Sequence, residues 1–455
     1  MRVRYLVALL AAFALLAAAC GDDDDSSDAS ASASEADASA SASEPADDDA
    51  SASASEPADD DASASASEPA DDDAAPAPAS GLDIDAILSA DLGNCAEAPT
   101  GDPIQVGMAM DFSDVVGFVD IPGSNLVPFV AEKANCAGGI DGRPVEVRVA
   151  EVGDDAALAT QELLDWGAHF LIGPPFADFA LPILQTTQGQ VPLFVAASTE
   201  PTLADSSINS YLVSFDDNQM SAAAAQWALD EGITRAIVFT EGEGVPYSGV
   251  NPDAFMAAFE AGGGEVVSVQ NYVWAADTDF SAQVNEIAGI SENNEAVFSA
   301  ALAFQVTALR GQLEGQGLDG LTYIGTDALD ATGIQDPEAA GGDNEGVVHT
   351  PHTSISSGDP IDTLLADYED ANGEALESRG FMALYVDSMF LGIQGMLDCG
   401  CDEPADIGAA VQQISGFQGL SGEITYAGTE GIPPKAVPIN RIVDGVDTLV
   451  ATIEP

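Results

Sequence analysis

The stretch Ile104–Met110, which reads IQVGMAM, is a short and almost uninterrupted apolar run. Such runs are typical of strands buried on both faces, as in parallel sheets that helices cover on either side. Similar runs follow at Val145–Val152, His169–Gly173 and Val191–Ala197, and helical periodicity alternates with them, as at Asp155–Trp166. This alternation predicts a βαβ series built on a buried parallel sheet.

A second series of the same kind follows along the chain. Its expected strands are Tyr211–Phe215, Ala236–Thr240, Glu265–Tyr272, Ala296–Ala301 and Leu321–Gly325, and its expected helices include Gln219–Leu229 and Ala254–Ala261. The predicted fold class is therefore α/β, with two doubly wound βαβ lobes. Loops at the carboxyl ends of the two sheets are where such folds bind ligands.

The first twenty residues have the pattern of a bacterial lipoprotein signal. Arg2 and Arg4 precede an apolar stretch from Tyr5 to Ala19, and small residues lead directly to Cys20. The stretch is short for a membrane span, and a cysteine after small residues is where lipid would be attached. We expect residues 1–20 to be the signal, with the mature chain lipid-anchored through Cys20 on the outer face of the cytoplasmic membrane. An ordinary secretory signal or an uncleaved anchor is the alternative.

Residues 21–80 repeat a twelve-residue unit made only of Ala, Ser, Asp, Glu, Gly and Pro. Nothing in this segment can build a core that offsets the entropy of ordering it. We expect residues 21–102 to be a disordered acidic linker and lead-in to the fold. A flexible chain of about sixty residues has a root-mean-square span of roughly 40–45 Å.

The formal net charge of −67 bears mainly on solubility and partners. A surface this acidic repels nucleic acid and anionic lipid, so no nucleic-acid partner is expected. Adaptation to salt or to the need for solubility is the interpretation we favour, and attraction of cationic solutes is the alternative.

Cys20 is assigned to lipid, which leaves an even four cysteines in an exported chain. Four cysteines allow three pairings, and the sequence does not choose among them. We favour disulfides between Cys95 and Cys136 and between Cys399 and Cys401. A metal site from the last two with His349 or His352 lacks the usual zinc spacing, so no metal is expected.

No catalytic or cofactor motif stands out. The first expected strand leads into Asp111–Asp114 without the glycines of a dinucleotide fingerprint, and the sequence has no phosphate loop or Gly-x-Ser-x-Gly elbow. His169, His349 and His352 do not adjoin a plausible nucleophile, so His169 is assigned to the structure and the other two to a loop. The chain is not expected to be an enzyme, and no cofactor is expected.

Several motifs, taken in order, resemble a known family. They are Ile104–Gly107, Ala134–Val145, Leu171–Pro174, Val191–Thr199, Tyr323–Asp327 and Tyr385–Asp387. Together they are similar to type I periplasmic solute-binding proteins of the leucine/isoleucine/valine-binding group, the lipoprotein receptors of ABC importers.

The resemblance implies two lobes joined by a three-crossover hinge, with a small solute enclosed between them. Lobe 1 would comprise residues 103–213 and 351–422, and lobe 2 residues 214–350 and 423–455, with Gly422–Tyr426 as a strand returning to lobe 2. A monomer would deliver its solute to an ABC permease and its ATPase. The alternative is a membrane-tethered sensor or scaffold of the same fold without transport, which neighbouring genes would distinguish.

The resemblance also implies a binding site. Ala197, Ser198 and Thr199 match a loop that holds a carboxylate in amino-acid-binding relatives, and Asp327 matches their acidic partner for an ammonium group. Asp327 could equally be a turn residue. The full candidate set is Ser113, Phe118, Phe176, Ala177, Asp178, Ala197, Ser198, Thr199, Tyr247 and Asp327.

Two departures from the family pattern make a branched-chain amino acid doubtful. Phe176, Ala177 and Asp178 stand where relatives commonly have a serine, and Asp178 could cap the following helix itself. The family's second-lobe aromatic is replaced by Ala301 or Leu302. An amino-acid-like, amide, amine or aromatic solute is therefore expected.

Overall fold

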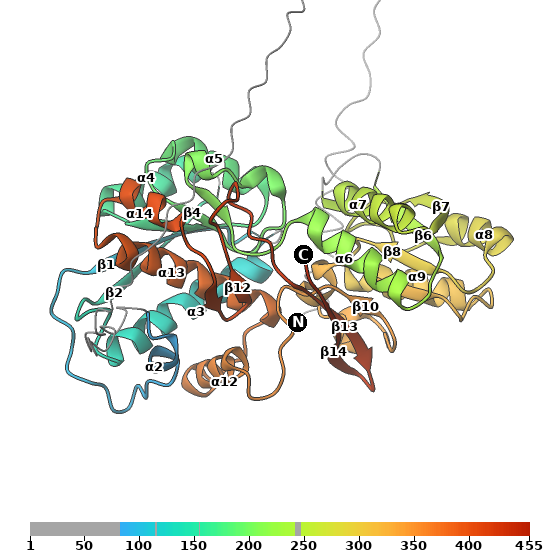
Figure 1. Ribbon diagram of the computed structural model, residues 1–455. Coiled ribbons are helices and arrows are strands. Elements are labelled where there is room, and N and C mark those ends of the chain that lie inside the picture. Colours follow the sequence, from blue (N-terminus) through green and yellow to red (C-terminus); the bar gives the residue numbers. More distant parts are fainter. Residues whose placement is uncertain (1–81, 114–115, 154, 242–246) are drawn as a thin grey trace, which may run out of the picture. The chain divides into compact units, whose positions relative to one another are not determined.

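The computed structural model describes residues 82–113, 116–153, 155–241 and 247–455 (Figure 1). The expected signal, the Cys20 lipidation site and the tether through residue 81 lie outside the described residues. Two large sheets organise the described part, and the chain passes from one sheet to the other three times.

The first sheet has five parallel strands in the order β2-β1-β3-β4-β5. Its strands are β1 (Ile104–Met110), β2 (Val145–Glu151), β3 (Phe170–Gly173), β4 (Leu193–Val195) and β5 (Ser210–Leu212). The helices that accompany it are α3 (Gly117–Cys136), α4 (Ala156–Trp166), α5 (Ala177–Thr187), α12 (Pro360–Asn372), α13 (Arg379–Cys399) and α14 (Pro404–Val411).

Alternation along the strands divides the side chains between two apolar layers. Val106 and Met108 of β1 pack in one layer with α3 and α13, whereas Ala109 packs in the other with α4 and α5. Of the described helices, α13 alone is long and apolar enough to cross a bilayer, but its side chains are almost all buried. It is a core helix, since Phe170 of β3 packs directly against its Gly392.

The second sheet has seven strands in the order β14-β13-β10-β9-β8-β6-β7, parallel except where β13 pairs with β10 and β14. The strands are β6 (Arg235–Thr240), β7 (Glu265–Asn271), β8 (Ala296–Ser299), β9 (Thr322–Ile324), β10 (Val348–His349), β13 (Val437–Val443) and β14 (Val446–Ile453). The helices are α6 (Asp217–Asp230), α7 (Tyr247–Ala261), α8 (Ser281–Ile290), α9 (Ala303–Glu314), α10 (Asp327–Ala331) and α11 (Pro337–Ala340). Residues of α6 and α7 pack on one face, and residues of α8 and α9 on the other.

The α/β class and the two doubly wound units are confirmed, but two strands differ in role from the prediction. The run expected to open the second series is β5, which pairs with β4 at the edge of the first sheet. The run at 145–152 is β2, an edge strand with most of its side chains partly or fully exposed. An apolar run does not encode which sheet it joins or whether it lies at an edge.

The prediction that Gly422–Tyr426 is a strand returning to lobe 2 is wrong. β12 (Gly422–Ile424) pairs with β11 (Phe417–Gly419) in a separate two-stranded sheet. Ile424 and Tyr426 are buried in the core of the first sheet, and the Tyr426 hydroxyl donates to the Leu212 carbonyl at 2.7 Å. After β12, the chain returns to the second sheet at β13.

The expectation of disorder through residue 102 is wrong for its last part. Residues Ile84–Leu88 form helix α2, and Ile87 and Leu88 are buried in the same core as α3. The structure contains both favoured disulfides, Cys95–Cys136 and Cys399–Cys401. The first of them ties the segment after α2 to the last residue of α3.

Candidate functional site

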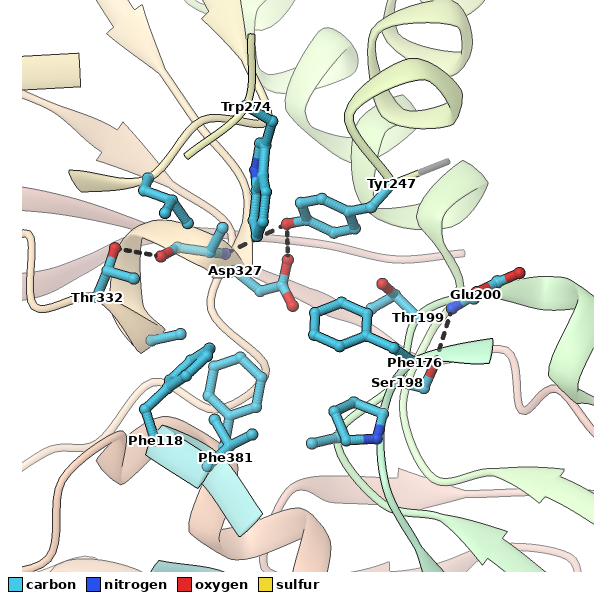
Figure 2. Close-up of a pocket in the computed structure, with 16 residues that line it drawn as sticks. Phe118, Phe176, Ser198, Thr199, Glu200, Tyr247, Trp274, Asp327, Thr332 and Phe381 are labelled. Atoms are coloured by element: carbon cyan, nitrogen blue, oxygen red, sulfur yellow. Dashed lines mark hydrogen bonds between the residues drawn. The ribbon is translucent and has the colours of Figure 1, made fainter. Parts of the chain in front are cut away.

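A cavity of about 580 Å³, including its open mouth, lies among loops and helices that follow strands of both sheets. Figure 2 shows the side chains that surround it. Elements of the first sheet contribute Phe118, Val119, Pro175, Phe176, Ala197, Ser198, Thr199, Glu200 and Phe381; elements of the second contribute Tyr247, Trp274, Leu302, Asp327, Ala328, Ala331 and Thr332.

The loop after β4 forms one wall and is fixed by its own hydrogen bonds. The Ser198 hydroxyl accepts from the Glu200 amide at 3.1 Å (Figure 2). The Thr199 hydroxyl donates to Asp217 Oδ1 at 2.6 Å, and the Asp217 amide donates to the Thr199 carbonyl at 2.8 Å. The loop is thus attached to the first turn of α6, which belongs to the second sheet.

Asp217 is buried behind this loop. Its Oδ1 also accepts from Asn251 Nδ2 at 2.9 Å. Burial raises the pKa of Asp217 to about 8, although its hydrogen bonds to Thr199 and Asn251 oppose the rise.

Asp327 is on the opposite wall, at the start of α10, with only 5% of its surface exposed. The Tyr247 hydroxyl donates to its Oδ1, and His352 Nε2 lies 3.0 Å from its Oδ2. Burial and the charge of Asp327 raise the pKa of Tyr247 well above its ordinary value, so this hydroxyl keeps its proton.

His352 connects Asp327 to the segments that join the two sheets. Its Nδ1 lies 2.7 Å from the Ser214 hydroxyl, its ring stacks on Phe215 at 5.3 Å between centroids, and Phe381 meets it edge-on at 4.6 Å. His352 lies in a loop, as expected, whereas His349 belongs to a strand, and both are fully buried. His349 ends β10 and contacts Asp447 at 2.9 Å.

Aromatic side chains dominate the rest of the cavity. Trp274, just after β7, is held by a hydrogen bond from Nε1 to the Ala300 carbonyl at 3.1 Å. It supplies an aromatic ring to the part of the cavity wall that comes from the second sheet, although Ala301 and Leu302 are not aromatic. Trp274 could have been predicted as a site residue, because it follows the end of an expected strand. Nothing in the local sequence indicated that Phe381 lines the cavity.

The structure brings together most of the predicted site residues. Phe118, Phe176, Ala197, Ser198, Thr199, Tyr247 and Asp327 line the cavity, whereas Ser113, Ala177 and Asp178 do not. The capping role considered for Asp178 is wrong: Phe176 occupies the N-cap position of α5, without a side-chain cap, and Asp178 is exposed in the first turn.

A family model described as "Periplasmic binding protein" matches residues 103–446. The chain belongs to this family. Among curated relatives, a Leu/Ile/Val-binding protein homolog from Brucella suis is 30% identical over 277 residues, which is 58% of this chain and 68% of the relative. The resemblance to type I periplasmic binding proteins is thereby confirmed.

Solved structures show the same fold for this periplasmic binding protein. A leucine-binding protein from Thermotoga maritima has a TM-score of 0.62 at 22% identity and covers 78% of this chain and 99% of its own. A branched-chain amino acid receptor from Streptococcus pneumoniae, solved with isoleucine, has a TM-score of 0.63 at 18% identity and covers 78% and 100%. A solute-binding protein from R. palustris, solved with benzoate, has a TM-score of 0.60 at 18% identity and covers 78% and 97%.

Within the described residues of this periplasmic binding protein, no group of three or more His, Cys, Asp and Glu side chains is placed to hold a metal ion. The metal site considered for Cys399 and Cys401 is wrong, because these two cysteines are joined to each other. The cavity therefore offers hydrogen bonds, aromatic surface and carboxylate charge as its means of binding.

Proposed function

We propose that this periplasmic binding protein is the extracytoplasmic solute receptor of an ABC importer. It captures a small solute in the cavity between elements of its two sheets and delivers it to a permease, with transport driven by the partner ATPase. One chain supplies every wall of the cavity, which supports a monomer as the working unit.

The observation that carries the proposal is that both sheets contribute residues to the cavity wall. Ser198 and Thr199 follow β4 of the first sheet, and Asp327 follows β9 of the second. A solute that touches both walls stabilises a closed arrangement that a permease can recognise. The moving lobes would be residues 103–213 with 351–422 and residues 214–350 with 423–455, except that Ile424 and Tyr426 pack with the first sheet.

Relatives and neighbours indicate the range of solutes to test. Their names and bound ligands include leucine, isoleucine, valine and benzoate. For this chain the candidate solutes are amino-acid-like, amide, amine or aromatic compounds.

A thermal-shift screen of the purified full chain tests the proposal. The panel comprises amino acids, amides, polyamines, aromatic amines and aromatic acids. A solute at about 100 times its dissociation constant adds about 2.7 kcal/mol to the free energy of unfolding, which is a readily measured rise in melting temperature. If no member of the panel raises the melting temperature, the receptor proposal is wrong.

We also propose that Cys20 carries the lipid that holds the receptor at the outer face of the cytoplasmic membrane. Cys20→Ser should move the protein from the membrane fraction to the soluble extracytoplasmic fraction, because one hydroxyl replaces the thiol that would be acylated. Immunoblots of both fractions measure the change, with the wild-type protein as the control. Retention of the Cys20→Ser protein in the membrane would refute lipid anchoring.

A further inference from the structure

The charged groups that line the cavity are all acidic. Asp327 and Glu200 are among its lining side chains, and no lysine, arginine or histidine is. Within the described residues, Asp327 forms no ion pair with a lysine or arginine. A ligand carboxylate would therefore meet carboxylates on both walls and no cationic side chain in the cavity lining, since His352, which lies 3.0 Å from Asp327 Oδ2, does not line the cavity.

Of the two hydroxyl groups in the loop after β4, only one is free to donate to a solute. The proton of Thr199 is committed to Asp217 Oδ1, an atom that also accepts from Asn251. This oxygen remains an acceptor even when the other oxygen of Asp217 is protonated. Ser198 keeps one donor proton for a solute, since its oxygen accepts from the Glu200 amide.

Aromatic rings surround the buried carboxylate. Figure 2 shows the carboxylate of Asp327 pointing into the space between Phe118, Phe176 and Phe381, with Tyr247 and Trp274 beside it. Faces of aromatic rings attract cations, and the attraction is stronger where water is excluded. The Tyr247 hydroxyl donates to one oxygen of Asp327 and His352 Nε2 lies 3.0 Å from the other, and a carboxylate has further lone pairs for a ligand.

We propose that the solute is an organic cation: an amine or quaternary ammonium group on an apolar body, without a carboxylate. The ammonium group lies against Asp327 among the aromatic rings, and the apolar body fills the rest of the cavity. This inference rests on the proposed receptor function and names its class of substrate. It separates this chain from neighbours solved with isoleucine or benzoate, whose ligands carry a carboxylate.

A ligand series of nearly constant shape tests the proposal by isothermal titration calorimetry on the purified full chain. The probes are benzylamine, benzyltrimethylammonium, benzyl alcohol, benzoate and L-phenylalanine, with isoamylamine and L-leucine as an aliphatic pair. We expect the better benzyl cation to bind at least tenfold more tightly than benzyl alcohol, an advantage of about 1.4 kcal/mol or more. We expect benzoate and both amino acids to bind more weakly than the corresponding amines.

A comparison of variants shows which carboxylate causes the preference for a cation over the alcohol. Glu200→Gln removes the charge on the opposite wall and is expected to change the cation-to-alcohol ratio by less than about threefold, since Glu200 is partly exposed and screened. Tighter binding of benzoate, L-phenylalanine or L-leucine than of the amines overturns the cation proposal and leaves the receptor function standing. Equal affinities, or no binding by any probe in the series, also overturn it. The receptor function itself fails only if the broader thermal-shift panel yields no ligand.

Discussion

Lys435→Met should lower the free energy of unfolding by about 3–5 kcal/mol, because it leaves a buried carboxylate without its compensating charge. Lys435 and Asp387 are both fully buried and are joined through Ser421. Lys435 Nζ donates to Ser421 Oγ at 2.6 Å, and Ser421 Oγ donates to Asp387 Oδ2 at 2.6 Å. Lys435 also donates to the Val213 carbonyl at 3.3 Å, so one ammonium group connects two of the three segments that join the sheets.

The pH dependence of this loss distinguishes a charge effect from a packing effect. Burial already raises the pKa of Asp387, and Lys435 opposes the rise, so removing Lys435 raises that pKa further. A carboxyl whose folded-state pKa is raised stabilises the fold at low pH and loses that contribution as the pH increases through the folded-state pKa. The loss of stability caused by Lys435→Met should therefore be larger at pH 7 than at pH 5. Burial lowers the pKa of Lys435 to about 8, so the wild-type lysine is mainly charged at both pH values.

Urea denaturation at both pH values measures the deficit, with Lys133→Met as the matched control. Lys133 is equally buried but pairs at 2.7 Å with Asp367, whose side chain is 42% exposed. Its loss should cost less and vary less with pH, since water solvates the carboxylate left behind. The double variant Lys435→Met/Asp387→Leu should recover part of the stability. A loss of the same size at both pH values, with no recovery in the double variant, would contradict the charge explanation.

The sequence revealed the parts of the fold that depend on local pattern. The apolar run of Ile104–Met110 becomes β1, and Ala236–Thr240 becomes most of β6, because a strand buried on both faces requires such a run. The sheet to which β5 belongs was not predictable in the same way. Tyr211 and Leu212 meet the two apolar layers of the first sheet, and the partners that decide this lie far away in the sequence.

The same division applies to the cavity. Ser198, Thr199 and Asp327 stand directly after expected strands. Their position at the cavity could therefore be predicted from the topology, because ligands bind at the carboxyl ends of such strands. The contact of His352 with Asp327 did not, since it depends on how the segment after β10 passes between Phe215 and Phe381. The link from Lys435 through Ser421 to Asp387 is hidden from pattern analysis for the same reason.

Asp327→Asn should weaken binding of the best cationic probe by about 2–5 kcal/mol, or roughly 30-fold to 5,000-fold, because a desolvated charge pair loses one partner. Asn is chosen because its side-chain oxygen can still accept from the Tyr247 hydroxyl, which Asp327 does now. Calorimetry should show a much smaller loss for benzyl alcohol, since a neutral probe makes no ion pair. The melting temperature of the empty protein should change little.

Two further variants complete the comparison. Ser198→Ala removes one neutral donor and should cost about 1–3 kcal/mol for a solute with an acceptor, and little for a simple ammonium ion. Asp327→Ala also removes the acceptor for Tyr247, so a lower melting temperature for Ala but not for Asn would assign the structural role to that hydrogen bond. If Asp327→Asn binds the cationic probe as tightly as the wild type, Asp327 does not hold the solute. If Asp327→Asn instead lowers the melting temperature of the empty protein as much as Asp327→Ala does, the carboxylate serves mainly the fold. In that case the fold requires the negative charge of Asp327 beside His352.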